Sequence, residues 1–194
     1  MLKEDFLVEL GTEELPPKAL LKLSKSFQTG IIEGLKKESL AHGEVKSFAT
    51  PRRLAVLVCA LDEKQADRTT QKFGPAVKAA FDTHGNPTRA ADGFAKSCGV
   101  LVADLGRAPK DGVEKLSFSS TLPGKSTNEL LPAIVDAALA KLPIPKRMRW
   151  GASRNEFVRP VHWLVMLFGE EVVPSTIMGV TSGADSFGHR FHHP

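Results

Sequence analysis

The segment from Pro17 to Ala41 constrains the fold more than any other part of the sequence. Its apolar residues recur every three or four positions, at Leu20, Leu23, Phe27, Ile31, Ile32 and Leu35. This spacing predicts a long amphipathic helix whose lysines lie on the opposite face. Pro16 and Pro17 suit the first turn of such a helix, where a missing N–H costs little.

Strands are predicted on both sides of this helix. Phe6 to Leu10 alternates like a short strand, and Val45 to Phe48 resembles another. Thr50 to Arg53 forms a turn, and the apolar run from Leu54 to Leu61 is long enough to lie centrally in a sheet. A strand, a helix and two further strands indicate an α+β fold.

The middle of the chain predicts a small helical insertion at about 75–108. A strand at 69–74 precedes it, and short helices are expected at 75–81 and from Thr88 to Cys98. Residues 113–121 resemble an edge strand or one arm of a hairpin. Ser126 and Thr127 then cap a helix over 128–142, which Pro143 and Pro145 end.

The C-terminal part predicts a β-hairpin, with strands at 161–168 and 172–180 joined at Gly169. The expected fold class is therefore α+β: a mixed or antiparallel sheet with a long N-terminal helix, a small helical insertion and a C-terminal β-hairpin. A chain of 194 residues can form one such region, or a small pair of domains. Residues 1–194 need not be complete at the C-terminal end.

Composition favours a cytoplasmic protein. The N-terminus carries Glu4, Asp5 and Glu9 and lacks the apolar core of a signal peptide, and no stretch is long and apolar enough for a membrane span. Cys59 and Cys98 are far apart and suit free thiols in a reducing compartment. The formal net charge of +4 gives a weak indication of an anionic partner.

The strongest indication of function is the basic and aromatic stretch at residues 146–163. This stretch contains five basic residues, four residues with rings and a single acidic residue, Glu156. The rings are Trp150, Phe157, His162 and Trp163. Such a surface can bind a phosphate backbone and stack on bases. The same composition also arises where basic stems cover apolar surface beside a buried tryptophan.

A second basic group, the pair Arg52–Arg53, stands at the start of a predicted strand, where side chains can face a ligand. Arginine suits bidentate contact with phosphate and stacking on bases. The residues predicted to contact RNA are Arg52, Arg53, Lys146, Arg147, Arg149 and Arg159.

Three other motifs have ordinary structural explanations. Glu13 and Glu14 could transfer protons, but they also suit the positive end of the following helix. His189, His192 and His193 have spacing compatible with zinc, but a fourth ligand is missing. Residues 93–105 resemble a helix-turn-helix, yet their second helix offers no Arg, Asn or Gln for reading bases.

Motifs of autonomous enzymes are missing from the sequence. It contains no GxGxxG, GxxxxGK[ST], GxSxG or HExxH. We therefore predict no catalytic residue, no metal site and no cofactor within these residues.

Seven segments, in this order, resemble the N-terminal part of the β subunit of bacterial two-subunit glycine–tRNA ligase (glycyl-tRNA synthetase). They are LVELGTEELPPKAL (7–20), TPRRLAV (50–56), GPAVKAAFD (74–82), GNPTRAADGFAKSCGV (85–100), KRMRWG (146–151), FVRPVHWLVMLFG (157–169) and GHRF (188–191). Together they span nearly the whole chain. Ser186–Phe187, before GHRF, departs slightly from the threonine usual in this family.

The resemblance implies a fragment of a longer subunit whose HD-like region and anticodon-binding domain lie further downstream. It implies an α2β2 heterotetramer in which the α subunit carries the class II catalytic core and binds ATP, Mg and glycine. The β subunit then supports the charging of tRNA(Gly) through tRNA binding, subunit assembly or both. By a looser analogy, the region is similar to domains of the phenylalanine–tRNA ligase β subunit.

Two alternatives stay open. The region could be a purely structural module that docks on the α subunit through the 161–180 hairpin or the 17–41 helix. More remotely, residues 93–105 could make it a DNA-binding regulator.

Overall fold

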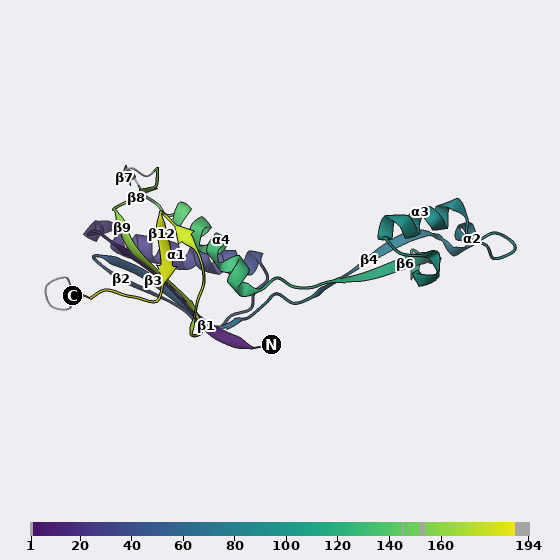
Figure 1. Cartoon of the computed structure of the whole chain (residues 1–194), viewed down its shortest axis with the longest axis horizontal. Helices are drawn as coiled ribbons and strands as arrows, with labels where there is room; N and C mark the ends of the chain where they lie inside the picture. The colour runs from purple at the N-terminus through teal and green to yellow at the C-terminus, as the bar shows by residue number, and fades with distance from the viewer. Residues whose placement is uncertain (1, 145, 152–153, 189–194) are drawn as a thin grey trace. The chain divides into compact units, whose positions relative to one another are not determined.

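The computed structural model describes residues 2–144, 146–151 and 154–188 (Figure 1). The chain forms two compact units. Unit 1 comprises Met1–Ala66 and Lys125–Pro194, and unit 2 comprises Asp67–Gly124. Each unit has a hydrophobic core of its own, and the core of unit 1 is much the larger.

Unit 1 is built on a seven-stranded mixed sheet, counted over its described residues, which confirms the predicted fold class. The strand order is β11-β12-β9-β1-β3-β2, and β10 also pairs with β9. The pairs are antiparallel except for β12 with β9, which is parallel. The strands are β1 (Lys3–Thr12), β2 (Val45–Thr50), β3 (Arg53–Asp62), β9 (Val161–Phe168), β10 (Glu171–Val172), β11 (Thr176–Ile177) and β12 (Val180–Gly183).

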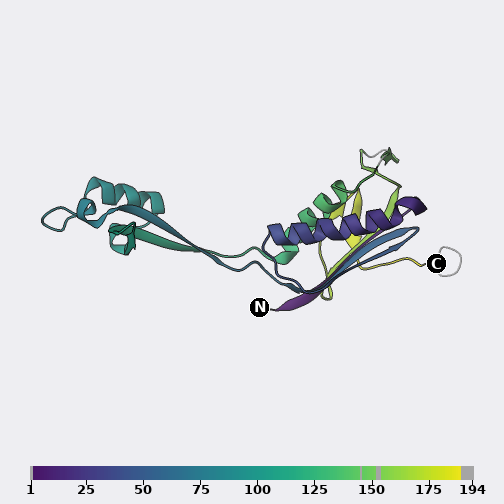
Figure 2. The ribbon, with the colours of Figure 1, turned by 180° about the vertical axis from the view of Figure 1, so that it is seen from behind.

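The central strand β1 separates two faces of different character. Phe6, Val8 and Leu10 are fully buried on one face, whereas Leu7 and Glu9 point to the other, as strand alternation requires. The helices α1 (Pro17–Lys37) and α4 (Thr127–Ala140) cover the first face (Figure 2). This arrangement is a two-layer α/β packing with the main core between the layers.

Helix α1 begins at Pro17 as predicted but ends at Lys37, before Ala41. The chain turns there because Ser39 adopts a left-handed φ of 56° and the Leu40 N–H donates to Leu35 O. The buried residues of α1 include Leu23, Phe27, Ile31 and Leu35, which follow the predicted spacing. Ser126 caps α4 as expected, because its Oγ accepts a hydrogen bond from the Glu129 N–H at 3.4 Å.

Unit 2 contains a three-stranded antiparallel sheet of order β4-β6-β5 together with two short helices. Its elements are β4 (Arg68–Ala76), α2 (Val77–Ala80), α3 (Arg89–Cys98), the 3-10 helix η1 (Val102–Asp104), β5 (Gly106–Lys110) and β6 (Val113–Leu122). The expected helices at 75–108 therefore lie within a unit that also contains strands. Ala80, Ala91 and Leu116 form its buried core.

Strand β6 was predicted as an edge strand or a hairpin arm. It is the arm of a hairpin with β5, joined at Asp111 and Gly112, whose φ values of 56° and 75° are typical of a tight hairpin turn. The edge assignment is wrong, since β6 lies between β4 and β5. The helix-turn-helix resemblance at residues 93–105 is not confirmed, because α3 is followed by a three-residue 3-10 turn and not by a second α-helix.

The C-terminal hairpin of β9 and β10 is confirmed, but the predicted second strand at 172–180 is wrong in extent. Strand β10 ends at Val172, two residues before Pro174, which has no N–H to donate to a ladder. A second tight hairpin through Met178 and Gly179 then joins β11 to β12. None of the helices in the described part of the chain has the length and apolar character needed to cross a membrane.

Candidate nucleic-acid interface

The basic residues predicted as a site gather at one end of the unit 1 sheet and on a small hairpin beside it. Three segments meet at the sheet end: the residues after β1, the turn before β3 and the residues before β9. Backbone hydrogen bonds hold them together, from Thr12 N to Arg52 O at 2.9 Å, from Glu13 N to Pro160 O at 2.9 Å and from Leu15 N to Pro51 O at 2.6 Å.

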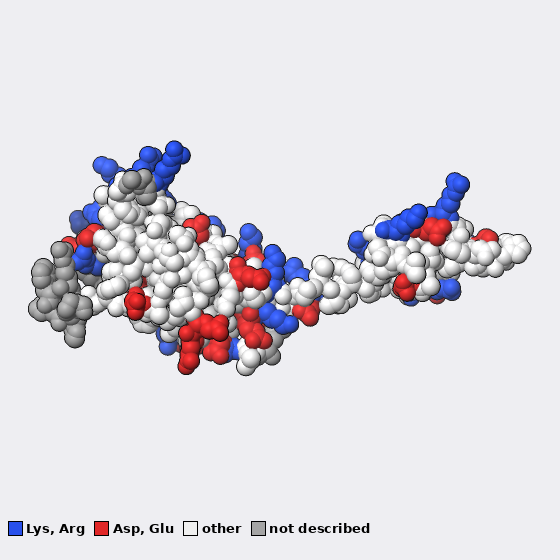
Figure 3. All heavy atoms as spheres, in the orientation of Figure 1, with Lys and Arg blue, Asp and Glu red and all other residues white. Residues whose placement is uncertain are grey.

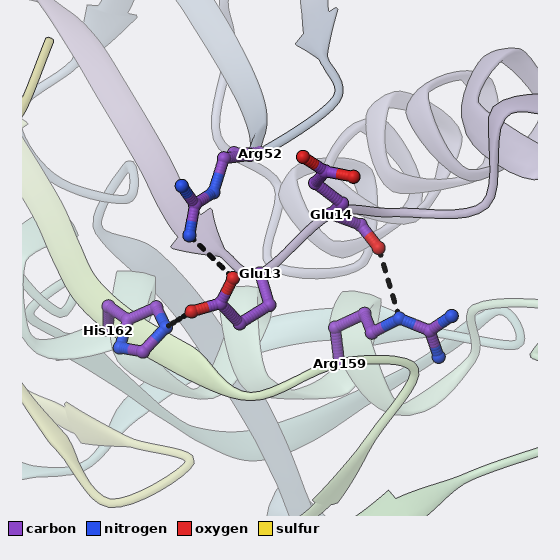
Figure 4. Close-up of polar contacts among 5 residues, drawn as sticks. All are labelled: Glu13, Glu14, Arg52, Arg159 and His162. Carbon is purple, nitrogen blue, oxygen red and sulfur yellow. Dashed lines mark hydrogen bonds and ion pairs between the residues drawn. The ribbon is translucent and has the colours of Figure 1, made fainter. Parts of the chain in front are cut away.

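Glu13 lies between Arg52 and His162 (Figure 4). Its Oε2 accepts from Arg52 Nη2 at 2.5 Å, and its Oε1 lies 2.9 Å from His162 Nε2. The hydrogen bond with His162, reinforced by the charge of Arg52, holds the pKa of the Glu13 carboxyl below its ordinary value of 4.5. Glu13 therefore keeps Arg52 oriented and partly neutralised.

The expectation that Glu13 and Glu14 complement the N-terminus of α1 is wrong. No acid lies in the first turn of α1, because Leu15 and Pro16 separate the two glutamates from the helix. Glu14 contributes its backbone carbonyl instead, which accepts a hydrogen bond from Arg159 Nε at 3.0 Å (Figure 4). Arg159 thus fixes the segment before β9 to the segment after β1.

Arg53 contacts a different set of residues from Arg52. Its Nε lies 3.4 Å from Glu9 Oε2, and its guanidinium carbon lies 5.9 Å from the centre of the Trp163 ring. Its Nη2 donates to Phe187 O. Because the side chain is 30% exposed and already has three partners, Arg53 acts chiefly as a structural residue.

Glu9 organises this cluster, and sequence reasoning missed it. Its side chain is 9% exposed, and its Oε1 accepts from Trp163 Nε1 at 2.8 Å and from Ser186 Oγ at 2.6 Å. The Trp163 ring lies directly over Gly11, where an added Cβ would come within 2.0 Å of it. The one available signal was a carboxylate within the apolar strand pattern of β1.

The remaining predicted cations belong to a hairpin of β7 (Met148–Arg149) and β8 (Glu156–Phe157). Arg149 Nε lies 2.6 Å from Glu156 Oε1, but its side chain is 68% exposed. Arg147 donates to Ala140 O at the end of α4 at 3.0 Å. Lys146 is exposed and makes no hydrogen bond or ion pair with any described residue. Lysine and arginine side chains gather over this hairpin in Figure 3.

The rings of the stretch do not form an open stacking surface. Phe157 is fully buried, and Trp150 and Trp163 are half-buried, Trp150 against the main core. This burial agrees with the alternative explanation, in which basic stems cover apolar surface. His162 is the exposed ring, at 47%, and it is engaged with Glu13.

The structure thus divides the six residues into two sets. Arg52, Arg53 and Arg159 hold segments together at the sheet end, and Lys146, Arg147 and Arg149 lie on or beside the hairpin. Arg159 links the two sets, since its Nη1 lies 3.9 Å from Met148 Sδ. All six belong to unit 1.

No group of three or more His, Cys, Asp or Glu suited to a metal ion occurs among the residues that the structure describes. The candidate zinc ligands His189, His192 and His193 lie outside those residues.

The chain matches the family described as "Glycyl-tRNA synthetase beta subunit" over residues 6–194. The chain belongs to this family. Relatives named glycine–tRNA ligase β subunit are 54% identical in Hahella chejuensis, 55% in Pseudomonas entomophila and 56% in Pseudomonas aeruginosa strain LESB58. Each comparison covers all of this chain and 28% of the relative's length, at the relative's N-terminal end. The resemblance noted from the sequence is therefore confirmed.

Proposed function

We propose that this chain is the tRNA-handling N-terminal part of a glycine–tRNA ligase β subunit. It supports the ATP-dependent attachment of glycine to tRNA(Gly) by binding tRNA, and the bond-making step belongs to the α subunit with its ATP and Mg. The working assembly is an α2β2 heterotetramer. Two observations support this proposal: the chain's membership of the β-subunit family and the exposed basic side chains of the β7–β8 hairpin.

The observation that carries the proposal is the charge of the hairpin. Lys146, Arg147 and Arg149 are exposed around a two-stranded ribbon, and among the described residues the acid that pairs with this group is Glu156, through Arg149. An exposed ion pair of this kind is easily exchanged for a phosphate, because it contributes little in water. Binding of phosphates by such residues releases counterions and makes affinity depend steeply on salt.

The sheet-end arginines have a supporting role in this proposal. Arg52 and Arg159 hold segments together at the sheet end, and their carboxylate and carbonyl partners leave them less free for RNA. Replacement of Lys146 or Arg149 therefore tests the RNA contact more directly than replacement of Arg52 or Arg53.

The test is tRNA(Gly) binding by the α/β assembly with Lys146→Gln and Arg149→Gln combined. We expect weaker binding and a log–log salt slope reduced in magnitude by about 1.5, since each lost phosphate contact removes about 0.7 to 0.9. The matched control is Lys18→Gln with Lys22→Gln on α1, which removes the same charge from another exposed face. Equal slopes in all three proteins would remove the hairpin from the RNA interface.

The second candidate is a purely structural module docked on the α subunit. Leu21 favours it, because this apolar side chain on the outer face of α1 is 72% exposed. Leu21→Lys would then weaken co-purification of α with β while tRNA binding by β persists. Unchanged co-purification would remove α1 as the docking surface.

A further inference from the structure

An apolar strip crosses the face of the unit 1 sheet that α1 and α4 do not cover. Leu57 on β3 pairs with Leu7 on β1, Leu7 with Leu167 on β9, and Leu167 with Val172 on β10. Residues paired directly across strands point to the same face, so these four side chains form one row. Leu7 lies on the face opposite the buried Phe6 and Val8.

The strip is open at both ends. Val172 is 39% exposed at one end. At the other end, on β2, Lys46 pairs with Leu57, and Phe48, which pairs with Ala55 in the next row, is 51% exposed. Leu7, Leu57 and Leu167 between them are half-buried. Contiguous exposed apolar side chains of this kind are characteristic of surfaces that another element covers. We name Phe48, Leu57, Leu7, Leu167 and Val172 the apolar strip.

The chain's own C-terminal segment already covers the neighbouring rows of this face. Ser186 donates to Glu9, and Phe187 packs edge-on against Trp163, with ring centres 5.2 Å apart. Ala55 and Val165, in the row of Glu9, are 5% and 2% exposed. The half-buried row of Leu57, Leu7 and Leu167 comes next, and Phe48, at the β2 end of the Glu9 row, stays exposed. Residues 184–188 therefore run close to the strip without covering these side chains.

We infer that, in a full-length β subunit, residues that follow position 194 pack on the apolar strip and complete a second layer over this sheet. The matched region is 28% of the length of the relatives, so most of such a subunit follows it. Residues 184–188, the last that the structure describes, lie beside this face. This inference depends on family membership and not on tRNA binding.

A later segment of the same β subunit is a better candidate to cover the apolar strip than the α subunit or a second β subunit. A segment tethered to residues 184–188 has a high effective concentration at the strip, whereas a separate chain must also bear the cost of association. The charges in this row stand at its β2 end, where Lys46 pairs with Leu57 and its Nζ lies 3.2 Å from Glu44 Oε2. Leu57, Leu7, Leu167 and Val172 add none of the charges that commonly orient a separate partner.

The test is photocrosslinking in the full α/β assembly. The photoreactive phenylalanine analogue benzoylphenylalanine replaces Phe48 in one variant and Val172 in another, so that it reports on both ends of the strip. We expect a crosslinked product with the mass of a single β chain. Tryptic mapping of this product should show the probe joined to a residue beyond position 194. A product of α with β, a product of two β chains, or no product at either position would overturn the inference.

The control places the same probe at Leu21, which is 72% exposed on the helical side of unit 1. We expect no crosslink from Leu21 to the peptides that capture the strip probes. Aminoacylation and tRNA binding by the Phe48 variant are measured in parallel. A tRNA-binding result of either sign leaves the crosslink assignment unchanged, so failure of the proposed function and failure of this inference are distinguishable.

Discussion

The buried carboxylate of Glu9 is the residue on which the sheet end depends most. It accepts from Trp163 and Ser186 and pairs with Arg53. We predict that Glu9→Gln lowers the free energy of unfolding of unit 1 by about 2 kcal/mol, because hydrogen bonds to a charged group are lost and Arg53 loses its counter-charge. Urea unfolding followed by tryptophan fluorescence measures the change.

The control for Glu9 is Glu33→Gln, which removes an ion pair with Lys141 whose side chains are 59% and 70% exposed. Such a pair contributes less than about 1 kcal/mol. If the two substitutions cost the same, burial of Glu9 has no special energetic role.

Glu13 makes stability depend on pH in a defined direction. Its pKa is lower in the folded state than the ordinary 4.5, so the folded state releases this proton more readily. The stabilisation is therefore complete above about pH 4.5 and is lost as pH falls through the folded pKa. Wild type should unfold at higher urea than Glu13→Gln at pH 7, and the difference should narrow below pH 4.5. A difference that is constant from pH 7 to pH 3 would contradict this assignment.

At this scale the sequence singled out basic residues that the fold places in one unit, but it did not predict which protein groups they contact. The cations at 52–53 and 146–159 do lie in one unit. Their carboxylate partners Glu9 and Glu13 could not be assigned, because those contacts depend on the register of β1 with β3 and β9. Side-chain burial of Phe157 likewise follows from tertiary packing rather than from local pattern.

At the scale of elements, the crossing of α1 and α4 depends on a small residue. A Cβ added at Gly30 would lie 2.9 Å from Ala138 Cβ and 3.0 Å from Ala138 Cα, so backbone would have to move. We predict that Gly30→Ala lowers the free energy of unfolding by up to about 2 kcal/mol, since overpacking costs about 1 to 3 kcal/mol and the gain in helix propensity offsets about 1 kcal/mol of it. Calorimetry measures the change, and adding Ala138→Gly should recover part of it.

Gly93 provides the matched control, because it lies in α3 with nothing within 4 Å of an added Cβ. Gly93→Ala should raise stability by about 1 kcal/mol. Loss of stability at both glycines would mean that close packing at Ala138 is not the cause.

Elements with strong internal periodicity were predictable, and those that depend on a distant partner were not. The strands β1 and β3 and the helices α1 and α4 each carry a long apolar pattern, so their positions were predicted to within a few residues at each end. Strand β5, GRAPK, has no apolar alternation and forms because β6 pairs with it. The two-residue strands β7 and β8 are too short to have a period.

At the scale of the whole molecule, unit 2 interrupts unit 1 between β3 and α4. Both chain segments that lead to it are joined within unit 1. Gln65 N donates to Lys125 O at 2.9 Å, and Lys64 forms an antiparallel bridge with Ser126. The larger core, which includes Phe6, Phe27 and Leu131, consists of unit 1 residues.

This pairing predicts that unit 1 folds without unit 2. Replacing residues 66–124 by Asn-Gly should close a two-residue hairpin turn between Gln65 and Lys125, which lie opposite each other, since that dipeptide favours the positive φ values such a turn needs. Because no residue of the unit 1 core is removed, its free energy of unfolding should change by no more than about 1 kcal/mol. Calorimetry and urea unfolding measure this, and a loss of the cooperative transition would show that the core of unit 1 requires unit 2 to form.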